Sequence, residues 1–182
     1  MSKIKIGVMG SAGKIDTARG PDFERTVAAL AAALAKREAI LFSGATTGLI
    51  YEVGRAAHAA GVFHVGISPA SSLEEHINRY RLPSDGCDVL VYTGFGLKGR
   101  NVVLVRSCDV VLFFAGAMGS LNEFTIAHDE GKVIGCLQGT GGVADEVDYL
   151  LQKFSKDTNA RVFQNEDPEA LLRACATYFE GR

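Results

Sequence analysis

Short apolar runs alternate along the chain with segments whose apolar residues recur at helical spacing. The run from Asp109 to Phe114 is the most hydrophobic, which is typical of a strand that is buried on both faces. Phe23, Val27 and Leu30 lie four and three residues apart, as on one face of an amphipathic helix. The apolar runs predict strands at residues 4–9, 39–42, 62–67, 89–92, 109–114, 133–137 and 161–163.

Apolar strands that are separated by helices form a parallel sheet with helices on both faces. We expect further helices at residues 49–60, 99–107, 119–130 and 143–154. A last helix should begin at Asp167-Pro168, with Asp as the N-cap and Pro at the first position. The length of 182 residues is that of one domain. The prediction is a single Rossmann-like, doubly wound α/β domain over residues 1–182, with about seven mostly parallel strands.

Composition and charge exclude several other classes of protein. With 47% hydrophobic and 22% charged residues, the chain has the composition of an ordinary globular protein. Nineteen basic and 21 acidic residues leave a net charge of −2, which argues against a broad basic surface for nucleic acid. The longest helical apolar run, residues 27–35, is far shorter than the roughly 20 residues of a membrane span. We therefore expect neither nucleic acid nor a membrane as a partner.

The cysteines and histidines are each far apart in the sequence. No C-x-x-C pair occurs, and three of the four cysteines lie within or beside apolar runs. This pattern predicts reduced, mostly buried thiols in a cytoplasmic protein. The apolar stretch before Gly10 is too short for a signal peptide. Since the histidines do not cluster, we expect them to be packing or surface residues and expect no metal site.

The first glycine-rich segment, residues 7–13, follows the first predicted strand. Its spacing is G-x-x-G-x-x-G, whereas the dinucleotide fingerprint is G-x-G-x-x-G. Ser43 also stands after the second strand, where that fingerprint has an acidic residue. We therefore expect no NAD site. Backbone amides at Gly10 and the Ser11 hydroxyl remain candidates for binding a phosphate or a ribose, and a tight turn is the alternative interpretation.

The second segment, residues 43–48, stands directly before a predicted helix. Gly44, Thr46 and Thr47 place small and hydroxyl-bearing residues where a helix N-terminus offers unpaired amides. The segment therefore predicts an anion cradle. The alternative, which is compatible with it, is that one of the threonines caps the helix.

The third segment, residues 115–123, follows the most hydrophobic strand. Gly116 and Gly119 would let a ligand approach the backbone closely, and Ser120 would open the next helix. The alternative is local, because Ser120 and Glu123 have the spacing of an S-x-x-E capping box. Arg100 lies at the start of the helix that leads into this strand. An Arg and a Glu that face a glycine-rich loop are typical of a site for a phosphorylated sugar.

These segments, in this order, resemble the SLOG superfamily, which includes the LOG phosphoribohydrolases and the molybdenum-cofactor carrier proteins. The family's G-V-x-G-S matches residues 7–11, and its G-G-x-x-G-L is similar to residues 43–49. Its P-G-G-x-G-T-x-x-E motif aligns with residues 115–123, and its preceding Arg aligns with Arg100. The resemblance extends to about Asp145. It implies a phosphorylated nucleotide-type ligand at the three loops, no cofactor, and a homodimer or larger homo-oligomer with contacts through the helix at 99–107 and the one after Gly119.

The chain departs from the hydrolase motif at several positions. Ala115 replaces Pro, Ala117 replaces the second Gly, and Ser120 replaces Thr. Asn101 follows the Arg where the hydrolases usually have Lys. Together with the stretch at residues 139–145, this resembles the carrier-like branch of the family. The departures weigh more against hydrolysis than against ligand binding.

Two functional hypotheses follow from the resemblance. In the enzyme hypothesis, a nucleoside 5′-monophosphate loses its base: the loop amides and Ser120 hold the phosphate, Glu123 stabilises the sugar cation, and Arg100 positions the base or Glu123. In the carrier hypothesis, the same loops hold a nucleotide or the molybdenum cofactor without chemistry. For residues 71–88 we expect a connection over the site, in which Arg79 or Arg81 reaches an anion or is simply solvated.

Overall fold

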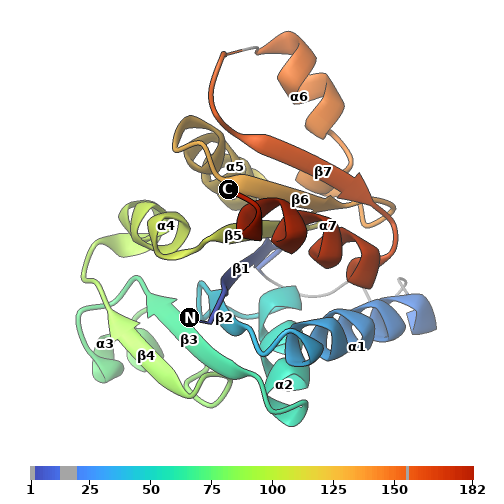
Figure 1. Cartoon of the computed structure of the whole chain (residues 1–182). Helices are drawn as coiled ribbons and strands as arrows, with labels where there is room; N and C mark the ends of the chain where they lie inside the picture. Colours follow the sequence, from blue (N-terminus) through green and yellow to red (C-terminus); the bar gives the residue numbers. More distant parts are fainter. Residues whose placement is uncertain (1–2, 13–19, 155) are drawn as a thin grey trace.

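A computed structural model of the chain describes residues 3–12, 20–154 and 156–182. Gly13, the last glycine of the first predicted loop, lies outside these residues. The described strands form one parallel sheet in the order β4-β3-β2-β1-β5-β6-β7 (Figure 1). They are β1 (Lys5–Gly10), β2 (Ile40–Ser43), β3 (Phe63–Ser68), β4 (Val89–Tyr92), β5 (Val110–Phe114), β6 (Val133–Leu137) and β7 (Arg161–Asn165). The predicted doubly wound α/β class is confirmed.

Helices cover both faces of this sheet. They are α1 (Gly20–Lys36), α2 (Leu49–Ala59), α3 (Leu73–Asn78), α4 (Gly96–Ser107), α5 (Met118–Asp129), the short 3₁₀ helix η2 (Gly142–Ala144), α6 (Val147–Lys153) and α7 (Pro168–Glu180). In the described parts of the chain, no helix combines the length and the apolar character that a membrane span requires.

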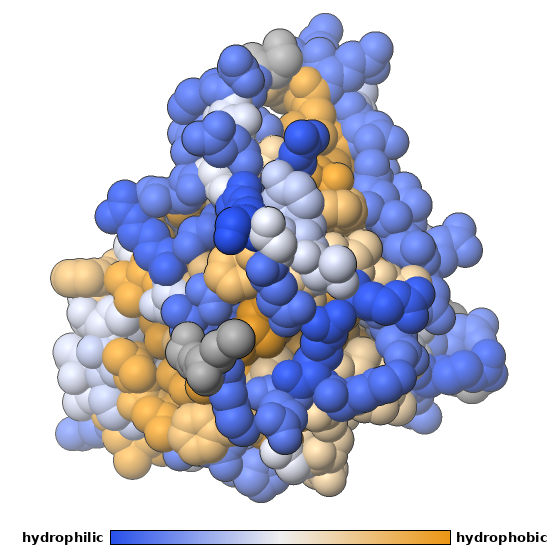
Figure 2. All heavy atoms as spheres, viewed as in Figure 1, coloured by the Kyte–Doolittle hydropathy of each residue, from blue (hydrophilic) through white to orange (hydrophobic). Residues whose placement is uncertain are grey.

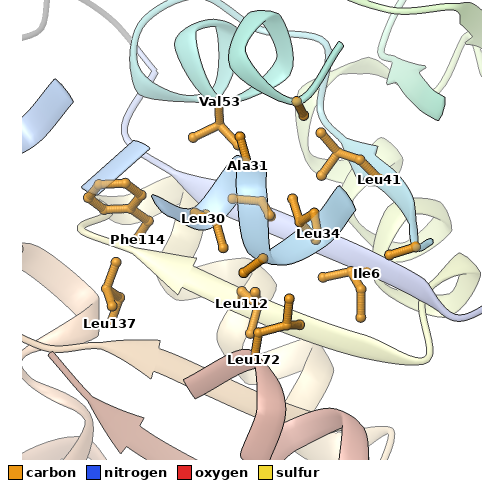
Figure 3. Close-up of a cluster of buried hydrophobic side chains, with 14 of the residues drawn as sticks. Ile6, Leu30, Ala31, Leu34, Leu41, Val53, Leu112, Phe114, Leu137 and Leu172 are labelled. Carbon is orange, nitrogen blue, oxygen red and sulfur yellow. The ribbon is translucent and has the colours of Figure 1, made fainter. Parts of the chain in front are cut away.

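The core has two layers, one on each face of the sheet. Side chains along a strand alternate between faces, so Leu112 and Phe114 of β5 pack with α1, α2 and α7. Val111 and Phe113 pack with α4, α5 and α6 on the other face. Figure 3 shows the first layer, in which Leu112 and Phe114 lie near side chains of the helices and neighbouring strands. Since both faces are buried, every position of β5 must be apolar, which explains its sequence.

Helix ends follow local signals where those signals are strong. Asp167 caps α7 by accepting a hydrogen bond of 2.7 Å from the amide of Ala170, and Pro168 is its first residue, as predicted. At the end of α1, Glu38 takes a left-handed conformation with φ 49°, and the amide of Ala39 donates to the carbonyl of Leu34. Glycine usually takes this position, since a side chain there is strained.

Three sequence predictions need correction. Residues 71–88 include a helix, α3, because Ser72 caps it by accepting from the amide of Glu75, and Arg79 pairs with Glu75 at the surface. Helix α4 begins at Gly96, three residues earlier than expected. The helix expected at residues 143–154 is divided into η2 and α6.

Candidate functional site

The strand order reverses between β1 and β5, in the middle of the sheet. Gly10 and Phe114 are paired at the ends of these two strands, so the loops that follow begin side by side. The chain then runs to α1 on one face and to α5 on the other. In doubly wound folds, ligands bind in the crevice that such a divergence leaves at the carboxyl ends of the strands.

A cavity of about 200 Å³ lies at this point, which we call the switch-point cavity. It is bounded by the end of β1, the loop after β2, and the first turns of α4 and α5. Its lining includes most of the predicted site residues: Gly10, Ser11, Gly44, Thr46, Arg100, Gly119, Ser120 and Glu123. Gly116 and Thr47 are not part of the lining, and the side chain of Thr47 is exposed.

Two serines join the loops after β1 and β5. The Ser11 hydroxyl accepts a hydrogen bond of 3.2 Å from the amide of Gly116, and the Ser120 hydroxyl donates at 3.2 Å to the carbonyl of Gly10. The amide of Gly116 is therefore already used within the protein. At Gly116, φ is 114° and an added Cβ would lie 2.7 Å from the Cβ of Ser120, so the glycine is required by its backbone conformation and by its neighbour.

The capping interpretations of the second and third segments are wrong. Helix α5 begins at Met118, with Ala117 as an N-cap that makes no side-chain bond, so Ser120 and Glu123 do not form a capping box. Likewise Gly48 is the N-cap of α2, and neither threonine before it caps the helix. The first-turn amides of both helices thus lack a side-chain cap. At α5, the amides of Met118 and Gly119 have no carbonyl four residues back within the helix.

The Arg100 guanidinium is seated against the ends of β2 and β3. Only 5% of this residue is exposed, and Nη1 donates a hydrogen bond of 3.2 Å to the carbonyl of Ile67. A Cβ at Gly44 would lie 1.8 Å from Nη1, so Gly44 must be glycine to leave room for the arginine. Burial lowers the pKa of Arg100, and the negative charge of Glu123 opposes this effect.

Two buried Ser–His pairs fix the backbone on which Arg100 rests. Ser43 Oγ lies 2.8 Å from Nε2 of His64, whose Nδ1 lies 2.5 Å from the carbonyl of Gly86. Because that carbonyl can only accept, Nδ1 carries the proton and the serine hydroxyl donates to Nε2. At the end of β3, Ser68 and His76 form a similar pair with the ring nitrogens exchanged: Nδ1 lies 2.8 Å from Ser68 Oγ, and Nε2 lies 2.9 Å from the carbonyl of Pro83. Burial lowers the pKa of His64 to about 4, so the ring is neutral at pH 7.

Glu123 faces the same cavity and is only 7% exposed. Burial raises the pKa of its carboxyl to about 7, although the positive charges of Arg100 and Lys98 oppose the rise. Among the described residues, no direct ion pair within 4.0 Å joins Glu123 to either cation. The carboxyl therefore holds a proton in part at neutral pH, as groups that exchange protons or meet anionic ligands often do.

Sequence reasoning missed two polar residues of the cavity, Lys98 and Asn101. With its amide nitrogen facing the acceptors, Asn101 donates to Oε1 of Glu123 at 3.1 Å and to the carbonyl of Leu97 at 3.0 Å. Lys98 is exposed at the cavity. Their position beside Arg100 in the sequence was the available signal, since the first two turns of α4 contain all three residues.

The site offers positive charge and free amides but no cluster of metal ligands. Within the described ranges, no three His, Cys, Asp or Glu side chains are placed to share a metal ion. The four cysteines are free thiols, and all except the half-buried Cys87 are buried, as expected. The positive end of α5 and the Arg100 guanidinium can together hold an anion.

The parallel sheet, its reversed strand order and a polar cavity at the reversal define an α/β protein of the Rossmann-like, doubly wound class. Within this class, the chain belongs to the SLOG cluster4 family, whose model matches residues 3–172. The resemblance to the SLOG superfamily is thereby confirmed.

Several solved structures share the fold over nearly their whole length. TM1055 is 25% identical with a TM-score of 0.81, over 96% of this chain and 99% of that chain. A molybdenum cofactor binding protein from Rippkaea orientalis is 23% identical with a TM-score of 0.75, over 98% of each chain. The Moco carrier protein from Chlamydomonas reinhardtii is 24% identical with a TM-score of 0.74, over 99% of each chain.

Proposed function

We propose that the protein binds a phosphorylated ligand of the nucleotide or molybdenum-cofactor type in the switch-point cavity and acts as a binding or carrier protein. The observation that carries this proposal is the buried Arg100, which faces the cavity beside the uncapped first turn of α5. A buried cation with no carboxylate at ion-pair distance gains most from an anion that enters its cavity. Phosphate groups bind at such helix N-termini.

The size of the cavity indicates which part of the ligand it holds. Sites that enclose a whole small molecule have roughly 300–1,000 Å³. The switch-point cavity has about 200 Å³. It therefore suits the phosphate and an adjoining ring, while the rest of the ligand extends outward past Lys98 and Met118, both of which are exposed. The molybdenum cofactor binding protein and the Moco carrier protein, which share the fold, support the carrier form of the proposal.

Hydrolysis of a nucleoside 5′-monophosphate is the second candidate, and Glu123 favours it. A buried carboxyl with a pKa near 7 in the ligand cavity has the character of a catalytic group. Ala115 argues against it, since φ is 57° there and its amide donates to Thr140 Oγ1 at 2.8 Å. Proline, with φ near −65° and no amide hydrogen, cannot take this conformation. The loop thus differs in its backbone from the P-G-G motif that the hydrolases carry.

Calorimetry with AMP, GMP and the isolated molybdenum cofactor tests the proposal, with free base measured by chromatography in the same samples. We expect saturable binding of at least one of these ligands by the parent protein and at least tenfold weaker binding by Arg100→Ala. Binding without release of base supports the carrier. Release of base that is lost in Glu123→Gln establishes the hydrolase, and no binding of any ligand refutes the proposal.

We also propose a homodimer or larger homo-oligomer. The resemblance implies contacts through the helix at 99–107 and the one after Gly119, and apolar side chains at one edge of the sheet offer a second contact surface. Val89 and Val91 of the edge strand β4 are exposed, as are Phe63 and Phe95 nearby. Figure 2 shows hydrophobic surface gathered in this part of the molecule, over β4 and α3. Contiguous apolar surface of this kind marks interaction sites. Light scattering should give a mass above that of one chain, and Val91→Glu should lower it. A monomeric parent would contradict the proposal.

A further inference from the structure

Residues 115–117, between β5 and α5, are called the ligand loop below. The loop between β6 and α6, residues 138–145, contacts this ligand loop without lining the cavity. The amide of Val143 donates to the carbonyl of Gly116 at 3.0 Å, and the amide of Ala144 donates to the carbonyl of Ala115 at 3.1 Å. The Thr140 hydroxyl accepts from the amide of Ala115 at 2.8 Å and donates to the carbonyl of Leu137 at 2.5 Å.

These bonds account for the backbone polar groups of Ala115 and Gly116. Three of the four bind the 138–145 loop, and the fourth, the amide of Gly116, binds Ser11. Both residues have positive φ, 57° at Ala115 and 114° at Gly116. A non-glycine residue in this region is strained and persists only where its surroundings impose the conformation. The surroundings that impose it are the Thr140 hydroxyl and the amides of η2.

The 138–145 loop is itself closed by one carboxylate. Asp145 accepts hydrogen bonds of 2.8 Å from the amides of Gly139 and of Gly141. A Cβ at Gly142 would lie 2.0 Å from the carbonyl oxygen of Gly116, so the two loops touch through their backbones. Contact with the ligand loop thus explains Gly142, whereas Asp145 closes the 138–145 loop itself through the amides of Gly139 and Gly141.

We infer that Thr140 and Asp145 are positioning residues of the switch-point cavity. They hold residues 115 and 116 in the left-handed conformation that directs the first turn of α5 toward Arg100. This inference rests on the proposed function, because the first-turn amides of α5 are the ones that would bind the ligand. Neither residue touches the ligand, and both act through the backbone of the ligand loop.

Thr140→Val tests this role, because valine keeps the shape of threonine and removes its hydroxyl. Two measurements apply: the affinity for AMP by calorimetry, and the NMR shifts and hydrogen exchange of the backbone amides at residues 115–119. We expect Thr140→Val to weaken AMP binding at least tenfold, to speed exchange at Ala115 at least tenfold, and to shift the amides of Met118 and Gly119. Thr140→Ser, which restores the hydroxyl, should return all three readouts to within threefold of the parent.

A matched control is Thr125→Val on α5, which removes a hydroxyl that bonds only the carbonyl of Asn122 at the surface. It should leave all three readouts unchanged. If Thr140→Val leaves the amide shifts of Met118 and Gly119 and the affinity for AMP unchanged, the inference is overturned.

A parent protein that does not bind AMP counts against the proposed ligand class, and the amide shifts then decide the positioning role alone. If Thr140→Val does not fold, Asp145→Asn takes its place, since its amide group can accept from only one of the two glycines, and unchanged amide shifts there overturn the inference.

Discussion

Replacing Glu123 with glutamine should stabilise the protein at alkaline pH and leave its stability at acidic pH unchanged. Glutamine keeps the shape of the side chain, and its carbonyl oxygen can still accept from the Asn101 amide that contacts Oε1 of Glu123 at 3.1 Å. What it removes is an ionisable group in a buried position, 7% exposed. The substitution therefore isolates the free energy that is needed to ionise this carboxyl within the fold.

The magnitude follows from the two pKa values of this carboxyl. In the unfolded chain it releases its proton near the ordinary value of 4.5, whereas burial raises the pKa in the folded protein to about 7. Between these two values the folded state holds a proton that the unfolded state does not, so stability falls as the pH rises and the loss is complete above pH 7. At 1.36 kcal/mol for each pH unit, Glu123 destabilises the folded state by about 3 kcal/mol at pH 8. For a chain of this size, Glu123→Gln should raise the Tm at pH 8 by roughly 5–10 °C.

The assay is urea unfolding at pH 4, below both pKa values, and at pH 8, followed by circular dichroism. The control is Glu130→Gln at the end of the same helix, where the exposed carboxylate pairs with Arg106 and its pKa lies below the usual value. That variant should gain no stability at pH 8. If Glu123→Gln is no more stable than the parent at pH 8, or if its gain is equal at both values of pH, burial does not raise the pKa of Glu123 in the folded protein. A gain confined to high pH would show that the site keeps a carboxylate at a cost to the fold.

Three further predictions concern single positions. Glu38→Gly should raise the free energy of unfolding, measured with urea, by about 1 kcal/mol. The exposed Glu38 has φ 49°, and glycine takes this conformation without strain. A loss of stability in this variant would contradict the prediction. Because burial lowers the pKa of His64 to about 4 in the folded protein, the unfolded chain binds this proton first, and the contribution of His64 to stability should fall by about 3 kcal/mol as the pH drops from 6.5 to 4. This loss opposes the gain from Glu123 in the same range, so His64→Asn should become more stable relative to the parent as the pH falls. A stability difference between His64→Asn and the parent that does not change with pH would count against the assignment. Arg100→Ala should stay folded and raise the pKa of Glu123 further, because the variant lacks the positive charge of Arg100, which lowers this pKa. Carbon NMR titration measures the pKa of Glu123 in both proteins. An unchanged titration would show that the two groups do not interact.

The sheet was predictable because its signals are local and strong. A strand buried on both faces must be apolar throughout, as β5 is. Because such strands alternate with helices along the chain, few sheet topologies are possible. Helix α3 was missed because its six residues are too few to show a helical period, although its Ser72 cap was visible in the sequence. The capping-box interpretation of Ser120 and Glu123 failed because S-x-x-E is a pattern that a capping box and a buried site share, and only tertiary packing separates them.

The composition of the site was more predictable than its internal bonding. Glycine-rich segments after central strands indicated where the cavity lies, yet Gly44 serves to admit Arg100 and the Ser11 hydroxyl serves to join two loops. The Ser–His pair at the end of β2 joins residues far apart in the sequence, Ser43 and His64. No spacing rule reveals such contacts, because register and packing of the whole sheet set them.

A crystal structure of the protein grown with AMP would show whether the switch-point cavity binds the phosphate of a ligand. We expect density for the phosphate beside Gly119 and Ser120, within hydrogen-bond distance of first-turn amides of α5 and on the side of the cavity that Arg100 lines. Density for AMP at another place on the surface, with this cavity holding only solvent at saturating ligand, would rule out the proposed site.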